Sequence, residues 1–175
     1  MIFIKNYIEY IVNYDLLNKF KYNSIVNIPQ LKKIYLNFKC KTSLLKYLLS
    51  SLIALELISS KKSVLTYAKK ANIQFKLKKG SPVGCTVILR KKLMYLFLSE
   101  LLVTIFPKIF KSTNFYLKKI KVFSFKIRNP LIFDELEKRY SYFNKLTSLN
   151  ITIVSNSKNK KEFIFLLNSF KIPVF

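Results

Sequence analysis

Side chains that commonly carry covalent or proton-transfer chemistry are scarce in this sequence, which has no histidine and two cysteines, Cys40 and Cys85. A structural zinc site needs four ligands, commonly Cys and His, so two cysteines cannot form one within the chain. A nucleophilic cysteine or serine usually needs a histidine base, and none exists here. We expect two buried free thiols rather than a disulfide, because small secreted scaffolds use more cysteines.

The eight acidic residues are scattered, except for the group Asp134, Glu135 and Glu137. We interpret this group as the first turn of a helix, where acids complement the helix dipole, rather than as a catalytic pair. Lysine or carboxylate bases remain formally open, but the sequence has neither a P-loop nor a dinucleotide glycine fingerprint. We therefore predict a non-enzymatic protein with no catalytic residues, no metal site and no cofactor.

The charge of the chain is its strongest functional signal. Its 175 residues carry 32 Lys and Arg against 8 Asp and Glu, a formal net charge of +24, and all but three of the basic residues are lysines. A chain this basic repels itself unless a polyanion neutralises it, so a polyanionic partner is the first inference. Hydrophobic residues make up 51% and aromatics 15%, which favours a folded chain over a disordered one.

A membrane is the alternative partner, since the mean hydropathy is +0.20. The two most apolar windows, Leu44 to Ile58 and Leu93 to Phe110, are interrupted by charged residues and are shorter than the roughly 20 apolar residues that a spanning helix needs. We expect both to be core helices and predict no membrane insertion. A basic protein lying on a membrane surface stays open as the second hypothesis.

Apolar periodicity predicts the elements. Helices are expected over Asn6 to Phe20, from a Thr42 or Ser43 cap to Ser59, over Lys91 to Phe106 and over Lys158 to Phe170. Strands are expected over Leu31 to Lys41, Ser63 to Ala68, Cys85 to Leu89 and Asn150 to Val154, with a hairpin or long strand over Phe115 to Ile127. Residues 69–79 alternate Ile73, Phe75 and Leu77 with polar side chains and end in a turn over Gly80 to Gly84.

This element order favours an α+β fold: a mainly antiparallel sheet with helices packed on one face, in a split β-α-β, RRM-like arrangement. No Gly/Ser linker interrupts the pattern, so we predict one domain over residues 1–175, with an N-terminal helix through residue 21 and an α+β core over residues 22–175. In the first strand Ile34, Leu36 and Phe38 would face the helices. The opposite face would be basic and aromatic.

That face and the segments near it carry cations spaced for RNA phosphates. The predicted RNA-binding side chains are Lys32, Lys33, Tyr35, Asn37, Lys39, Lys61 and Lys62, and a loop over residues 69–80 adds Lys69, Lys70, Lys76, Lys78 and Lys79. Taken singly, each lysine is explained as well by solubility. For the set, the near absence of neighbouring acids favours binding.

The segment Tyr22 to Phe38 (YNSIVNIPQLKKIYLNF) resembles the start of the bacterial-type large-subunit ribosomal protein five family. The resemblance continues in one register through TYAKK at Thr66, FKLKKGSPVGCTVILR over Phe75 to Arg90, and FPKI at Phe106. It resumes at LIF (131–133), at LNITIV (149–154) and in the C-terminal segment that ends FKIPVF.

The resemblance implies a non-catalytic protein of the central protuberance, bound to 5S rRNA and large-subunit rRNA. By position, Lys33, Asn37 and Arg90 would face 5S rRNA, and the 69–79 segment would approach the P-site tRNA. Further implied partners are neighbouring central-protuberance proteins and, across the subunit interface, a small-subunit head protein. Gly80, Pro82 and Gly84 would shape the return of the loop.

Three features depart from the family pattern. Ser60-Lys61-Lys62-Ser63 stands where Gly-Gln-Lys-Pro is usual, Ile88 replaces a common Thr, and a shorter lysine-containing stretch replaces a Gly-rich segment between Phe110 and Ile127. In a ribosome without 5S rRNA, the partner would be a remodelled rRNA or another protein. Abundant Lys, Asn, Ile, Phe and Tyr share AT-rich codons, which indicates an organelle genome. We expect a mitochondrial matrix protein made in the organelle, with a plastid as the alternative.

Overall fold

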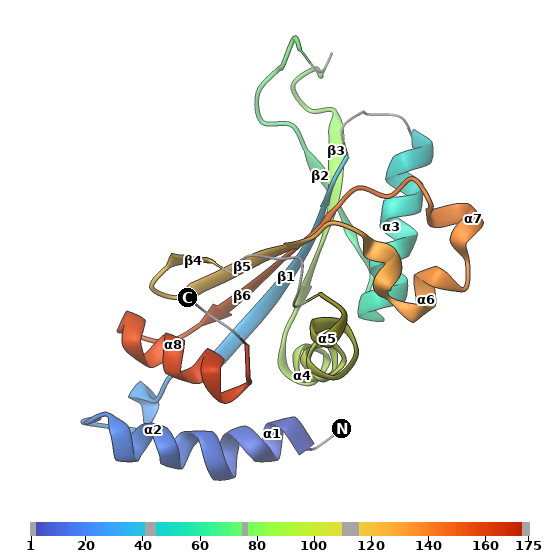
Figure 1. The fold of residues 1–175 in the computed structure, drawn as a ribbon. Helices are drawn as coiled ribbons and strands as arrows, with labels where there is room; N and C mark the ends of the chain where they lie inside the picture. The colour runs from blue at the N-terminus through green and yellow to red at the C-terminus, as the bar shows by residue number, and fades with distance from the viewer. Residues whose placement is uncertain (1–2, 41–44, 75–76, 110–115, 173–175) are drawn as a thin grey trace. The chain divides into compact units, whose positions relative to one another are not determined.

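A computed structural model describes residues 3–40, 45–74, 77–109 and 116–172. The chain divides into two compact units, one formed by Met1–Ile34, Arg90–Phe125 and Thr152–Phe175, the other by Tyr35–Leu89 and Lys126–Ile151. Hydrogen bonds order six strands as β2-β3-β1-β6-β5-β4 (Figure 1). The chain passes from one unit to the other within β1, β5 and β6. The single domain expected from the sequence stays a prediction.

The strands are β1 Leu31–Lys39, β2 Val64–Tyr67, β3 Pro82–Leu89, β4 Tyr116–Lys119, β5 Val122–Ile127 and β6 Leu149–Ser155. The α-helices are α1 Phe3–Tyr7, α2 Asn13–Lys19, α3 Leu45–Ser59, α4 Lys91–Glu100, α5 Phe106–Ile109, α6 Asp134–Glu137, α7 Tyr140–Phe143 and α8 Lys160–Ser169. Two π-helical segments, η1 Ile8–Val12 and η3 Leu101–Ile105, join α1 to α2 and α4 to α5, and short 3₁₀ turns occupy Ile25–Asn27 and Pro130–Ile132.

The first unit is built around its terminal helices and the α4–η3–α5 helix. Along the N-terminal helix the buried positions Ile8, Val12 and Leu16 recur every four residues. This spacing exceeds the 3.6 residues of an α-helical turn, and the wider π-helical turn keeps all three on the buried side. The Tyr7 hydroxyl donates a hydrogen bond to the Ser169 carbonyl at 3.2 Å, which ties the N-terminal helix to α8.

In the second unit α3 packs on β3 and contacts α6 and α7. The helix is apolar nearly all round, as the sequence indicates, and Leu48, Ala54, Leu55 and Ile58 are buried. α6 begins at Asp134, so the three acids grouped there lie in the first turn of a helix, as predicted. This four-residue helix buries only Leu136, and its acids are exposed.

Burial alternates along the strands, which confirms an α+β fold with helices on one face of a mainly antiparallel sheet. In β1, Ile34, Leu36 and Phe38 have no solvent exposure, whereas the residues between them are half-buried. In β6, Leu149, Ile151 and Ile153 are buried in the same manner. β2 pairs antiparallel with β3, and β4 pairs antiparallel with β5 as a hairpin.

The segment between β2 and β3 differs from its sequence pattern. Its alternation of apolar residues is typical of a strand, but the described part is a loop with one isolated bridge between Asn72 and Leu77. Ile73 is 94% exposed, and Phe75 lies outside the described residues. The β2–β3 ladder ends at Tyr67 and Pro82, beyond which no strand of the described chain pairs with this segment. The described part is thus a loop, as predicted for residues 69–80, and the alternation alone would have suggested a strand.

Two further differences concern the short helical elements and the position of Gly84. α7 and the 3₁₀ turns are not predicted, because four residues or fewer are too short to show a helical period. The sequence pattern places Gly84 in a turn, but this residue lies inside β3, which begins at Pro82. The predicted Thr42 or Ser43 cap of α3 lies outside the described residues.

Gly84 marks the closest approach of two strands in the second unit. A Cβ at this position would overlap the carbonyl oxygen of Phe38 in β1 and come within 3.1 Å of Thr66 Oγ1. Gly80 has φ +82° in the preceding turn, and its own Cβ position is open. Gly84 is therefore required for the packing of β3, whereas Gly80 is required for the backbone conformation of the turn.

We predict that Gly84→Ala lowers the free energy of unfolding by about 3 kcal/mol, because neither the β1 backbone nor β3 can move aside cheaply. Gly80→Asn is the matched control and should cost about 1 kcal/mol or less, since asparagine tolerates a positive φ. Urea denaturation followed by circular dichroism measures both. A Gly84→Ala protein as stable as the wild type would show that β1 and β3 do not approach this closely.

Candidate nucleic-acid interface

The predicted RNA-binding side chains of the first strand form a row on its open side, which we call the β1 row: Lys33, Tyr35, Asn37 and Lys39. The first three are half-buried and Lys39 is exposed, whereas the even-numbered residues from Ile34 to Phe38 are buried. Successive side chains of a strand point to opposite faces, so one strand separates an apolar side from a polar side. The sequence predicted this division correctly.

Asn37 is the most unusual member of the β1 row. Its Oδ1 atom is buried and has no hydrogen-bond partner among the described residues. A buried acceptor without a partner costs about 1–3 kcal/mol, and such an atom is expected where a bound molecule completes the hydrogen bonding. Asn37 Oδ1 can therefore accept a hydrogen bond from water or from a bound molecule.

Neighbouring polar groups of the second unit lie beside this row. Thr86 in β3 is half-exposed between buried Cys85 and Val87, and its hydroxyl donates to the Leu36 carbonyl at 3.1 Å. The ammonium of Lys61 donates to the Ile88 carbonyl at 2.7 Å, which brings the segment after α3 to the end of β3. Lys62 is exposed next to it. Sequence analysis missed Thr86, although the alternation of β3 places it on the open side.

Lys32 and Arg90 do not belong to the β1 row. Lys32 precedes Lys33 by one residue, so strand alternation turns it to the other side, where it is exposed at a pocket of the first unit. Arg90 is exposed between β3 and α4. Lys32 therefore lies on the other side of the strand from Lys33 and Tyr35.

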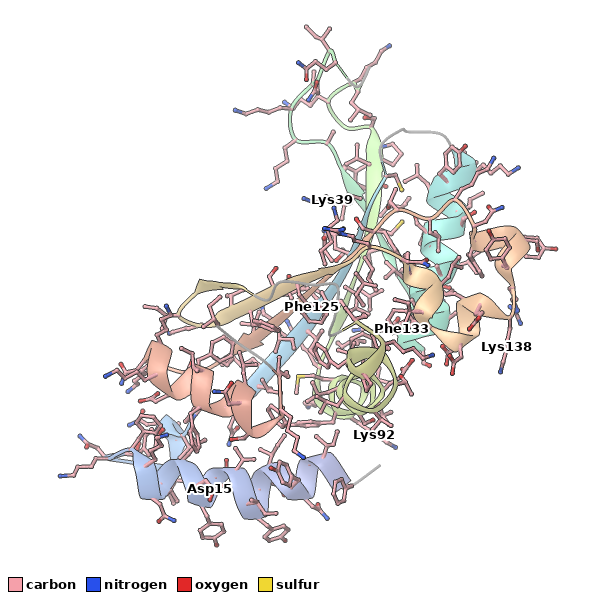
Figure 2. All side chains as sticks on the ribbon, in the orientation of Figure 1. Asp15, Lys39, Lys92, Phe125, Phe133 and Lys138 are labelled. Atoms are coloured by element: carbon pink, nitrogen blue, oxygen red, sulfur yellow. The ribbon has the colours of Figure 1, made fainter. Side chains whose placement is uncertain are left out.

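The loop over residues 68–81, which we call the hairpin loop, extends beyond the paired part of β2 and β3 (Figure 1). Its base is closed by Ala68 N–H to the Ser81 carbonyl and Gly80 N–H to the Ala68 carbonyl, and Asn72 and Leu77 exchange two hydrogen bonds, all at 2.9 Å. Nitrogen-tipped side chains project from it in Figure 2. Lys69, Lys70, Lys78 and Lys79 are exposed, Lys76 lies outside the described residues, and the loop sequence has no acid.

Within the described ranges, no three His, Cys, Asp or Glu side chains are grouped so that they could hold a metal ion. No helix in those ranges is long and apolar enough to cross a bilayer.

Both cysteines are free, as predicted, and they lie on either side of one hydroxyl, but only Cys85 is buried, so the prediction of two buried thiols is wrong for Cys40. Ser51 Oγ is 3.1 Å from Cys85 Sγ and 3.5 Å from Cys40 Sγ. Cys85 is fully buried, and this burial raises the pKa of its thiol, although the hydrogen bond with Ser51 partly opposes the rise. Cys40 is half-exposed. The two thiols should therefore differ in reactivity, since the thiolate is the reactive form.

We predict that a thiol reagent such as DTNB at pH 8 labels Cys40 in the native protein and labels Cys85 only after denaturation. The absorbance of the released thionitrobenzoate, followed with and without urea, measures both reactions. In Cys40→Ser, native labelling should fall close to zero. Rapid native labelling of that variant would contradict the buried, protonated state of Cys85.

The family and the relatives that match this chain are all ribosomal proteins. Residues 82–174, from β3 onward, match the C-terminus of the ribosomal protein five family. Large ribosomal subunit protein uL5m of Reclinomonas americana is 39% identical over 176 residues, which span 98% of this chain and 97% of that protein. Large ribosomal subunit protein uL5 of Wigglesworthia glossinidia brevipalpis is 39% identical over 163 residues, 90% of each chain. The same protein of Geotalea daltonii is 34% identical over 164 residues, 91% of this chain and 90% of the relative.

Proposed function

Since the chain belongs to the uL5 family of large ribosomal subunit proteins, we propose that it binds 5S rRNA through the β1 row. Family membership makes it a structural protein of the large subunit that associates with rRNA and serves translation. We assign it no catalytic activity. The finer assignment, a site for 5S rRNA in the central protuberance, is our proposal.

The single observation that carries this proposal is the unpartnered Oδ1 of Asn37. In folded RNA, 2′-hydroxyl groups donate hydrogen bonds and phosphates attract ammonium groups. The β1 row offers a partner for each group: the Asn37 amide oxygen can accept from a 2′-hydroxyl, and the lysines at positions 33 and 39, on either side of it, can bind phosphates. Thr86 adds a hydroxyl beside it, and Lys61 places a cation at the end of β3. A polar surface with cations at its ends suits shape recognition of a structured RNA.

The hairpin loop is proposed to approach the P-site tRNA. Its exposed lysines lie on an extended loop with no acid to neutralise them, so they favour phosphate contacts at a distance from the β1 row. Neighbouring central-protuberance proteins and a small-subunit head protein complete the proposed set of partners. Similarity to a mitochondrial relative supports a mitochondrial ribosome as the location, and the AT-rich residue usage supports synthesis in the organelle.

Binding of the purified chain to a bacterial-type 5S rRNA transcript tests the assignment of the β1 row. Asn37→Leu should weaken binding about tenfold, ~1.4 kcal/mol, without changing its salt dependence, because the lost interaction is a neutral hydrogen bond. Lys33→Gln should instead lower the slope of log Kd against log salt concentration by about one. Filter binding at several salt concentrations measures both.

Stability separates a binding role of Asn37 from a structural one. Asn37→Leu removes a buried acceptor that has no partner among the described residues, so the variant should unfold at the same or a higher urea concentration than the wild type. Asn18→Leu, at an exposed position of α2, is the control and should leave RNA affinity unchanged. Equal affinity of Asn37→Leu and wild type would overturn the assignment. Recovery with lipid vesicles and not with RNA would favour the membrane-surface hypothesis.

A second set of variants tests the hairpin loop. Replacing its four described lysines, at positions 69, 70, 78 and 79, by glutamine should leave 5S rRNA affinity within about twofold. The same change should weaken tRNA binding to the peptidyl site of reconstituted ribosomes, because four phosphate-facing charges are lost. A control protein loses four exposed lysines elsewhere: Lys158, Lys160, Lys161 and Lys171. Equal loss of tRNA binding in both proteins would mean that total charge, not the loop, matters.

A further inference from the structure

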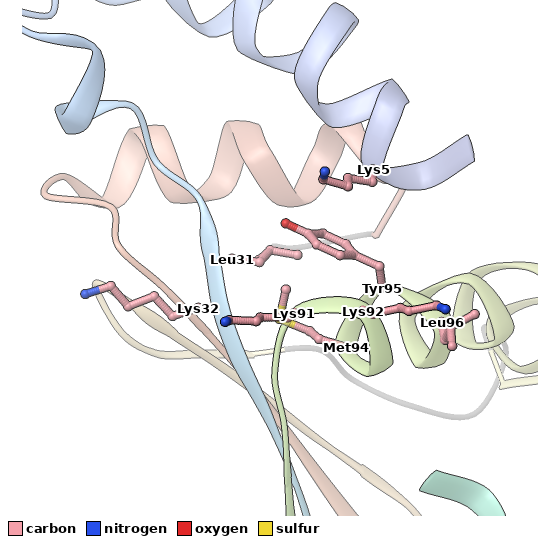
Figure 3. Close-up of a pocket in the computed structure, with 8 residues that line it drawn as sticks. All are labelled: Lys5, Leu31, Lys32, Lys91, Lys92, Met94, Tyr95 and Leu96. Atoms are coloured by element: carbon pink, nitrogen blue, oxygen red, sulfur yellow. The ribbon is translucent and has the colours of Figure 1, made fainter. Parts of the chain in front are cut away.

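A pocket of about 570 Å³ opens in the first unit between α1, the start of β1 and the first turns of α4 (Figure 3). We call it the Tyr95 pocket. Four lysines line it, Lys5, Lys32, Lys91 and Lys92, and no acid of the described chain does. Its size lies within the range of about 300–1,000 Å³ that is usual for small-ligand sites. Of these residues only Lys32 is among the predicted RNA contacts, and strand alternation turns it away from the β1 row.

The inner wall of the pocket is apolar and aromatic. Leu31 and Met94 are buried, at 8% and 1% exposure, and the half-buried ring of Tyr95 lies over them. Figure 3 shows this ring reaching from α4 towards Leu31, with Lys5 opposite. Burial, followed by the negative charge of Glu9, raises the pKa of the Tyr95 hydroxyl, and the positive charge of Lys5 partly opposes the rise.

The lysines are not equivalent. Lys5 Nζ lies 3.4 Å from the Glu9 carboxylate, so its charge is already partly neutralised. In Figure 3, Lys91 extends from the start of α4 towards β1, Lys92 extends the opposite way along α4, and Lys32 extends from β1 away from the Tyr95 ring. Lys32 and Lys91 also line the pocket and have no ion pair with an acid of the described chain, so their charges are available to an anion there.

An aromatic and apolar wall in a pocket that is also lined by lysines fits a ligand that has a planar ring at one end and a negative charge at the other. A free phosphate would leave the apolar wall uncovered, and an uncharged apolar molecule would leave the lysines unused. A nucleotide supplies both parts, because any base can stack on an aromatic side chain while its phosphate meets lysine. A base within a duplex is already stacked, so the nucleotide must come from a loop, bulge or end.

We propose that the Tyr95 pocket takes one unstacked nucleotide of the bound RNA, with its base against Tyr95 and its phosphate at Lys32 and Lys91. The proposal rests on the RNA-binding function proposed above and adds a second contact, distinct from the β1 row. It gives the chain a stacking interaction that surface lysines alone cannot provide, and with it a requirement for an unpaired base.

Fluorescence offers a direct test, since the chain has no tryptophan. Tyr95→Trp keeps an aromatic wall in the pocket and introduces a single indole fluorophore there. Adding a 5S rRNA transcript should quench its emission, because a stacked base contacts the indole. Tyr140→Trp, at a position that is 60% exposed in α7, is the matched control and should not be quenched. A fully paired RNA duplex should quench neither variant.

Affinity measurements on the full-length chain complete the test. Tyr95→Ala should weaken 5S rRNA binding about tenfold or more without changing the salt slope, whereas Tyr95→Phe should bind within about twofold of the wild type. Lys91→Asn should lower the salt slope by about one. Asparagine is chosen because Lys91 has φ +50°, a conformation that asparagine tolerates. If Tyr95→Ala fails to fold, the quenching of Tyr95→Trp still decides the question.

The outcomes distinguish this proposal from the one on which it rests. If the wild type binds 5S rRNA and responds to Asn37→Leu, but Tyr95→Trp is not quenched or Tyr95→Ala binds normally, the pocket is overturned and the β1 row stands. If no protein binds RNA, both proposals fall. Quenching of Tyr95→Trp by the paired duplex would overturn the requirement for an unstacked base.

Discussion

One-sided burial of the strands is the constraint on which the rest of the structure depends. Along β1, Ile34, Leu36 and Phe38 have no solvent exposure, whereas the residues between them are half-buried. Helices cover one face, so every polar group on the other face must find water, another residue or a bound molecule. Asn37 Oδ1 is buried without such a partner in the described chain, and the proposed contact with RNA rests on this atom.

Repulsion between the positive charges of the chain is the second constraint. A chain of net charge +24 repels itself, and few of its 8 acids are close in sequence to the lysines proposed to bind RNA. Lysines of the hairpin loop lie beyond the paired part of β2 and β3 and are exposed to water. Repulsion between their charges costs little free energy there, because water and salt screen it. At the Tyr95 pocket the lysines instead surround an apolar wall. RNA would relieve the repulsion at the loop by neutralisation, and at the pocket by neutralisation together with stacking.

Strand β1 shows how much of the fold local pattern can predict. Its period of two predicted both its bounds within two residues and the side chains on each face, since the same alternation decides burial. The same pattern in residues 69–79 was misleading. There the β2–β3 ladder stops at Pro82, no further strand of the described chain pairs alongside, and Ile73 projects into solvent. An alternating segment forms a strand only where a neighbouring strand can pair with its backbone and an apolar layer can pack against its apolar side chains.

The sequence by itself determined the class of fold, the sign of the charge, the absence of histidine chemistry and the β1 row, because composition and local periodicity specify each of these. Only the tertiary structure decided which distant segments meet. It placed Lys61 at the Ile88 carbonyl, brought Gly84 against Phe38, and gathered Lys5, Lys32 and Tyr95 around one pocket. Such contacts depend on how helices and strands pack across many intervening residues, and no spacing within a single segment encodes them.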